Sequence, residues 1–82
     1  MFYWGKTMIN IKELIPFMKD GWVAMDESGD WNWYKDKPEC DNDEDYIWKG
    51  GFDLVYLNPL FDIAPVDDWT KSLIQVKGVK AK

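Results

Sequence analysis

The residues of this chain that could carry chemistry are mainly carboxylates, and they are concentrated in one segment. The 82 residues include no histidine, no arginine and one cysteine. In an extended chain, the acidic segment would carry about one charge per 4 Å, close to the roughly 3.4 Å spacing of phosphates along a nucleic-acid strand. Such a segment can occupy a groove built for phosphates, so we expect it to contact a basic surface of a partner. Its members are Glu39, Asp41, Asp43, Glu44 and Asp45.

The acidic segment does not complete a calcium loop. Asp41, Asp43 and Asp45 alternate as the first three ligands of a helix–loop–helix site do, but that site then needs glycine at its sixth position and glutamate at its twelfth. Tyr46 and Phe52 stand at those positions. A solvated acidic loop is the plain alternative to partner recognition.

Catalysis is not expected of this chain. Asp26 and Asp30 are a carboxylate pair of the kind that can act as acid and base, but a chain this small encloses little pocket. No histidine is present to activate Cys40, and the sequence has no glycine-rich phosphate loop or metal-ligand set. We therefore expect a binding protein rather than an enzyme, without a cofactor or a metal ion.

Six tryptophans provide a second kind of interacting surface. Trp31 and Trp33 are two residues apart and share one face of a predicted strand, whereas Tyr34 points to the other face. Because a short helix covers only one face of a small sheet, we expect one of these faces to be partly exposed. Trp31, Trp33 and Tyr34 would then contact a partner by stacking on its cationic side chains. The tryptophans expected in the core are Trp22, Trp48 and Trp69.

The net charge of −5 is unevenly distributed. Residues 20–45 contain ten carboxylates and two lysines, and residues 71–82 contain four lysines and no carboxylate. This balance opposes direct binding to duplex nucleic acid and favours a basic protein partner, including one that itself handles nucleic acid. No apolar run reaches the roughly 20 residues of a membrane span, and no signal peptide is recognised. We expect a cytoplasmic location without membrane binding.

The hydrophobic pattern predicts an α+β domain with one short N-terminal helix packed on a small antiparallel sheet of three to five strands. The helix is expected over residues 10–20, where Asn10 caps it and Pro16 distorts it. Asp67 or Asp68 is expected to cap a brief helical turn. The predicted strands are 22–26, 31–35, 52–57 and 73–76, and the first two form a hairpin.

Residues 37–45 are predicted as a loop, because they contain a proline and many charges and offer almost nothing apolar to bury. The helix would cover one face of the sheet and leave the other available. We expect one domain over 1–82, with a frayed basic tail at 77–82. Residues 1–7 are left open between a strand, an extension and an upstream start.

The sequence FDIAPVDDWTKSL at 61–73 resembles the ending of small, tryptophan-rich proteins encoded by bacteriophages and prophages. GWVA at 21–24 and the Asp-x-x-Gly-x-Trp pattern at 26–31 match an earlier strand of those proteins. The resemblance spans most of residues 10–76. It implies a protein of the bacterial cytoplasm, made during infection or from a prophage, and it assigns no functional residues.

A fainter similarity connects the chain with phage anti-defence sponges that sequester cyclic nucleotides. Asp62-Ile63-Ala64 and Asp68-Trp69 approximate the ending of those proteins, but Asp26 and Glu27 stand where they carry a basic residue. A polyanionic nucleotide is a poor ligand for a chain without arginine.

The leading hypothesis from the sequence is a phage-type accessory protein, an anti-defence inhibitor that docks its acidic loop and aromatic hairpin on a basic host protein. Two alternatives stay open. One is a sponge for a nucleotide-like small molecule that acts as a homo-oligomer, and the other is a non-catalytic structural or assembly component of a virion.

Overall fold

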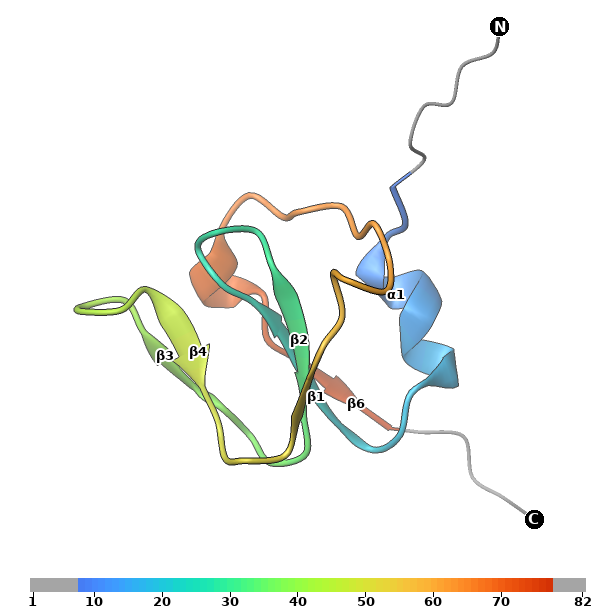
Figure 1. Ribbon diagram of the computed structural model, residues 1–82, viewed down its shortest axis with the longest axis horizontal. Coiled ribbons are helices and arrows are strands. Elements are labelled where there is room, and N and C mark those ends of the chain that lie inside the picture. Colours follow the sequence, from blue (N-terminus) through green and yellow to red (C-terminus); the bar gives the residue numbers. More distant parts are fainter. Residues whose placement is uncertain (1–7, 78–82) are drawn as a thin grey trace, which may run out of the picture.

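The computed structural model describes residues 8–77, which form three layers. A short helical segment lies on one side of a four-stranded antiparallel sheet, and a two-stranded hairpin lies on the other side (Figure 1). The predicted α+β class is thereby confirmed. The segment 1–7 and all of the predicted basic tail except Lys77 lie outside the described residues.

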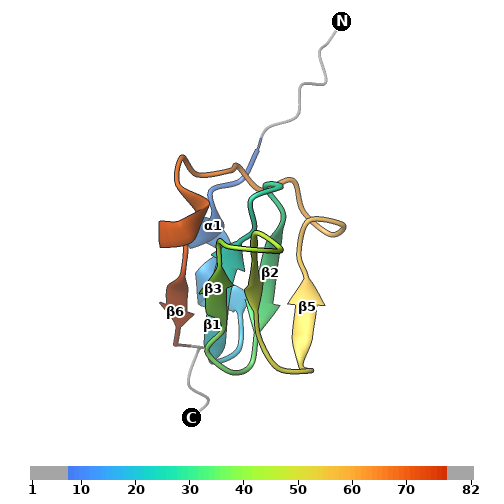
Figure 2. The same ribbon diagram turned by 90° about the vertical axis from the view of Figure 1, so that its left-hand side faces the viewer.

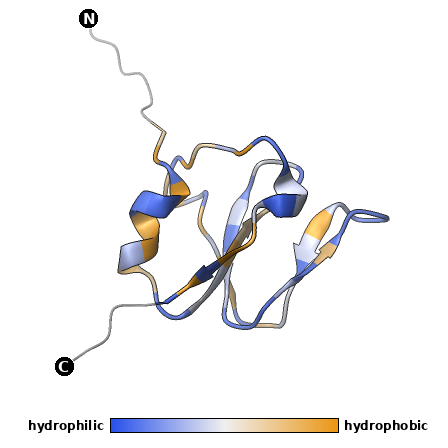
Figure 3. Ribbon diagram, turned by 180° about the vertical axis from the view of Figure 1, so that it is seen from behind, coloured by the Kyte–Doolittle hydropathy of each residue, from blue (hydrophilic) through white to orange (hydrophobic). Residues whose placement is uncertain are grey.

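The N-terminal helix is shorter than predicted. It consists of α1 (Ile11–Leu14) and the 3-10 turn η1 (Ile15–Phe17). The Asn10 side chain accepts a hydrogen bond from the Lys12 N–H at 2.9 Å, which confirms the predicted cap. Pro16 has no N–H to continue the α-helical bonding, and the chain tightens into the 3-10 turn around it. Figure 3 shows this segment with both hydrophobic and hydrophilic residues, as expected for a helix with one buried side.

Four strands form the main sheet in the order β5-β2-β1-β6. The central pair aligns Val23 with Trp33 and confirms the predicted hairpin. In its turn the Asp26 N–H donates to the Asp30 carbonyl at 2.9 Å, and Gly29 adopts a φ of 95°, which glycine reaches without a steric penalty. Figure 2 shows β5 and β6 at opposite edges of the sheet. The strand bounds are β1 (Gly21–Met25), β2 (Trp31–Tyr34), β5 (Leu54–Tyr56) and β6 (Ile74–Val76).

The prediction of a loop over 37–45 is wrong for Glu39–Asp41 and holds for the turn at 42–45. Residues Glu39–Asp41 form β3, which pairs antiparallel with β4 (Ile47–Lys49). Pro38 is fully buried at the base of this hairpin. The segment has little apolar surface of its own, but its strand partner contributes the buried Trp48, whose Cα is aligned with that of Cys40.

Both faces of the four-stranded sheet are covered, so the expectation of an open face is also wrong. On the helix side, a wholly apolar cluster includes Val23, Met25 and Trp31 together with Ile11 from α1. On the hairpin side, Ala24, Tyr34 and Trp48 form a smaller cluster. Each large side chain buried in these clusters contributes roughly 2–3 kcal/mol.

The C-terminal part of the described chain follows the prediction closely. Asp68 caps the 3-10 turn η2 (Trp69–Lys71) by accepting from the Thr70 N–H at 3.0 Å. The Ser72 hydroxyl then accepts from the Met25 N–H at 2.8 Å, and its single proton faces the Trp69 carbonyl at 2.7 Å and the Met25 carbonyl at 3.1 Å. In this way a buried serine side chain continues the contact between β1 and the segment that precedes β6.

Candidate functional site

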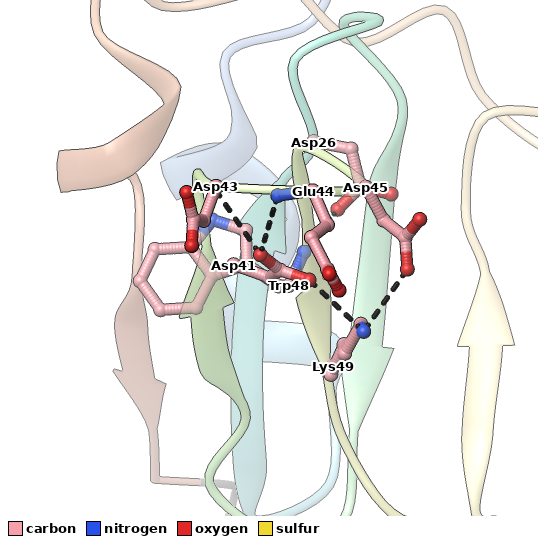
Figure 4. A network of polar contacts seen from close by, with 7 residues as sticks. All are labelled: Asp26, Asp41, Asp43, Glu44, Asp45, Trp48 and Lys49. Atoms are coloured by element: carbon pink, nitrogen blue, oxygen red, sulfur yellow. Dashed lines mark hydrogen bonds and ion pairs between the residues drawn. The ribbon is translucent and has the colours of Figure 1, made fainter.

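The tip of the β3–β4 hairpin is held together by the side chain of Asp41. Its Oδ1 accepts hydrogen bonds from the N–H groups of Asp43 and Glu44, both at 3.1 Å. Its Oδ2 lies 2.9 Å from the Lys49 Nζ (Figure 4). The Asp41 carboxylate therefore accepts hydrogen bonds from backbone N–H groups that backbone carbonyls would accept in a tighter turn.

Lys49 bridges two carboxylates of the acidic segment, because its Nζ also lies 3.0 Å from the Asp45 Oδ2. The hydrogen bond from Lys49, followed by those from the Glu44 and Asp43 N–H groups, holds the pKa of Asp41 well below its usual range. The same contacts, first with Asp41 and then with Asp45, raise the pKa of Lys49. Asp41 and Asp45 thus stabilise the hairpin internally rather than being fully available to a partner.

Three carboxylates of the acidic segment remain free for an external contact. Glu39, Asp43 and Glu44 are exposed, and within the described residues their side chains form no hydrogen bond or ion pair. The structure therefore divides the five predicted residues into a supporting pair and an outward-facing group of three.

Tyr46 is a residue of this site that the sequence analysis did not select. It follows the acidic segment with a φ of 57°, the left-handed region that tyrosine rarely adopts. Its carbonyl accepts from the Glu27 N–H at 3.3 Å, while the residue remains 44% exposed. An exposed aromatic residue with this rare backbone conformation, directly after the acidic segment in the chain, is a candidate for a functional role.

The hairpin is attached to the sheet by hydrogen bonds that surround Trp48. The Trp48 N–H donates to the Asp26 Oδ1 at 2.8 Å, and its indole Nε1–H donates to the Trp69 carbonyl at 3.0 Å. The Tyr34 hydroxyl donates to the Trp48 carbonyl at 3.2 Å. Because these partners come from three separate elements, the acidic tip is held in a defined position over the sheet.

Two of the three aromatic residues predicted to contact a partner are buried. Trp31 is 0% exposed and donates its Nε1–H to the Ala64 carbonyl at 3.2 Å. Tyr34 is 2% exposed, in the cluster beneath the hairpin. Trp33 is half-buried, with its Nε1–H bonded to the Lys19 carbonyl at 3.1 Å. The prediction that Trp31 and Tyr34 contact a partner is wrong, because Trp31 is buried in the helix-side cluster and Tyr34 is buried beneath the hairpin.

The tryptophans assigned to the core are all at least half-buried. Trp48 is buried, while Trp22 and Trp69 are half-buried beside the hairpin-side cluster. The Lys37 Nζ lies 5.4 Å from the centre of the Trp22 ring, a cation–π distance. The partial exposure of Trp22 is thus shielded by a charged side chain rather than left open to a partner.

Metal and thiol chemistry find little support in this part of the fold. Across residues 8–77, no group of three or more histidine, cysteine or acidic side chains is placed to hold a metal ion. Cys40 is exposed, and desolvation together with the charges of Asp41 and Asp68 raises the pKa of its thiol, which disfavours the nucleophilic thiolate. No helix in the described range is long and apolar enough to cross a membrane.

No protein-family model, curated protein or solved structure matches this chain. The site is therefore interpreted from its own geometry.

Proposed function

We propose that this chain is a small binding protein that docks the tip of its β3–β4 hairpin on a basic surface of a partner protein. The observation that supports the proposal is the outward-facing group of Glu39, Asp43 and Glu44, which the internal Asp41–Lys49 contact holds on an ordered hairpin. Ordering the charged groups before binding lowers the entropy that association costs.

The partner in this proposal is a bacterial host protein, and the chain is a phage-type accessory protein that inhibits it, for example within a defence system. The sequence resemblance to phage and prophage proteins supports this choice. Acidic groups favour a lysine- and arginine-rich surface such as those of proteins that handle nucleic acids. Tyr46 takes the role that the buried Trp31 and Tyr34 cannot fill, because it is 44% exposed and follows Glu44 and Asp45 in the chain.

The proposal is tested by capturing partners from a bacterial lysate with two matched variants. The double variant Asp43→Asn/Glu44→Gln removes two charges from the hairpin tip, and Glu13→Gln/Asp67→Asn removes two exposed charges elsewhere. We expect the first variant to weaken the affinity for a captured basic protein roughly 3- to 10-fold, the value of two exposed ion pairs, and to flatten its salt dependence.

The control double variant should bind as the unchanged protein does. Mass spectrometry identifies the captured proteins, and calorimetry measures the affinity at low and high salt. Equal binding by all three proteins would contradict docking through the hairpin tip.

A further inference from the structure

A pocket of about 380 Å³ with polar and apolar lining residues lies beside the hairpin, between the β1–β2 turn and the end of β5. Its polar lining residues come from both segments. Glu27, whose N–H donates to the Tyr46 carbonyl, belongs to the β1–β2 turn. The pocket therefore neighbours the acidic tip. The side chains that matter are those of Asp26, Asp30, Asn32, Tyr56 and Asn58.

The polar side chains of this pocket offer mainly acceptors. Asp26 accepts from the Trp48 N–H through Oδ1 and from the Asn32 Nδ2 through Oδ2, the latter at 3.3 Å. The Asn58 Oδ1 accepts from the Trp31 N–H at 2.7 Å, and the Asp30 Oδ2 accepts from the Ser28 hydroxyl at 3.1 Å. Each of these oxygens retains a second lone pair.

Asn32 supplies an acceptor that has no partner. The residue is only 5% exposed, and its Oδ1 is buried without a hydrogen bond. Its Nδ2 donates to Asp26 and, at 3.4 Å, to the Tyr34 hydroxyl, so the orientation of the amide is fixed. Buried polar atoms are nearly always bonded, so an unpartnered acceptor next to a pocket can be satisfied by a donor that enters the pocket.

The charge balance of the pocket favours a cationic ligand over an anionic one. Burial of the Asp26 carboxylate, and to a lesser degree the nearby charge of Asp30, raise its pKa against the opposing hydrogen bonds from Trp48 and Asn32. No lysine lines the pocket. An anionic ligand would add to the repulsion, whereas a cation would relieve it.

We propose that this pocket binds the guanidinium group of an arginine side chain. A guanidinium has five N–H donors and no acceptor, which matches the two carboxylates and the unpartnered Asn32 Oδ1. Its planar face can stack on the ring of Tyr56, which is 65% exposed and whose Cα is aligned with that of Asn32. Because the Asn32 Oδ1 is buried, a donor reaches it only when the side chains around it move.

The inference rests on the proposed function only for the source of the arginine, which would belong to the basic partner. A protein surface that meets the acidic tip can place one arginine in the adjacent pocket. The tip would then provide general attraction for positive charge, and the pocket would distinguish arginine from lysine.

The pocket is tested by nuclear magnetic resonance, with N-acetyl-L-arginine amide titrated into the ¹⁵N-labelled full chain. We expect saturable shifts of the Asn32 side-chain amide and the Trp31 backbone amide, with a dissociation constant on the order of 1–10 mM for so small a ligand. N-acetyl-L-citrulline amide has nearly the same shape without the charge and should produce no saturable shift. Equal shifts with both compounds, or an equal affinity for N-acetyl-L-lysine amide, would overturn the proposal.

Two matched variants locate the binding. Asp30→Asn lies in the pocket and should weaken the arginine probe about fivefold, whereas Asp43→Asn lies at the hairpin tip and should leave its affinity unchanged. The reverse result would place the probe on the tip and overturn the pocket. The probe needs no partner, so this experiment is independent of the lysate capture. Arginine binding in the pocket can be confirmed although capture contradicts docking through the tip. It can also be contradicted although capture supports docking.

Discussion

The two faces of the four-stranded sheet are covered in different ways. The helix-side face is closed by an apolar cluster that includes Val23, Met25 and Trp31. The hairpin-side face has fewer apolar side chains and adds the buried Asn32 and the half-buried Asp26 between them. Burial of apolar surface is non-directional, whereas a hydrogen bond requires particular atoms in particular places. The helix side therefore supplies most of the stability, and the hairpin side positions the polar groups.

The comparison explains why both candidate sites lie next to the hairpin. Asp26 joins them, because its Oδ1 bonds the β4 backbone and its Oδ2 bonds Asn32 at the wall of the pocket. A face that is held by polar contacts has polar atoms available for a ligand, and it can open locally at a smaller cost than the apolar core.

The largest expected effect comes from breaking the helix-side core. Trp31→Ala should reduce the free energy of unfolding by about 3–5 kcal/mol, which is most of the roughly 5–10 kcal/mol expected for a small domain. Urea denaturation followed by far-ultraviolet circular dichroism measures the loss. The matched control is Phe52→Ala, a fully exposed aromatic residue, which should change stability by less than about 0.5 kcal/mol. Similar losses in both variants would contradict the assignment of the core.

A smaller and local effect is expected on the hairpin side. Asp26→Ala leaves the Trp48 N–H without its acceptor and should cost about 1–3 kcal/mol. Hydrogen exchange of the β4 amides should accelerate more than that of Val23 in the core. Asp26→Asn retains an acceptor oxygen and serves as the control. If exchange rises equally in β4 and in the core, the hairpin does not open as a separate unit.

The smallest expected effects distinguish two carboxylates by their dependence on pH. The pKa of Asp41 is lowered in the folded protein, so its contribution to stability is present above the unfolded value of about 3.9 and is lost as the pH falls through the folded value. The pKa of Asp26 is raised, so its favourable contribution is present below about 3.9 and is lost as the pH rises through the folded value.

Urea unfolding at pH 7, 5, 4 and 3 tests this contrast with Asp41→Asn and Asp26→Asn. The stability of the unchanged protein relative to Asp41→Asn should decrease as the pH falls, while its stability relative to Asp26→Asn should increase. If both stability differences change in the same direction with pH, the pKa values of the two carboxylates are not shifted in opposite directions.

Much of the fold could be predicted because its signals are local. Asn10 and Asp68 cap their turns as expected, and Gly29 lies in the turn of the predicted hairpin. The candidate site was predicted only in part. Its acidic residues are evident from their types, but the contact between Asp41 and Lys49 depends on the pairing of β3 with β4. The available signals for that pairing were Cys40, which lies between two acidic residues, and the apolar pair Ile47-Trp48 beside Lys49.

The sequence by itself determined the α+β class, the central hairpin and the acidic character of the segment that follows it, because side-chain period, turn residues and charge act over a few positions. The tertiary structure alone decided that the hairpin covers the second face of the sheet. That packing buried Tyr34 and left Asn32 with an unpartnered oxygen, while the helix-side cluster buried Trp31. Such outcomes depend on contacts between residues far apart in the chain, which no local pattern specifies.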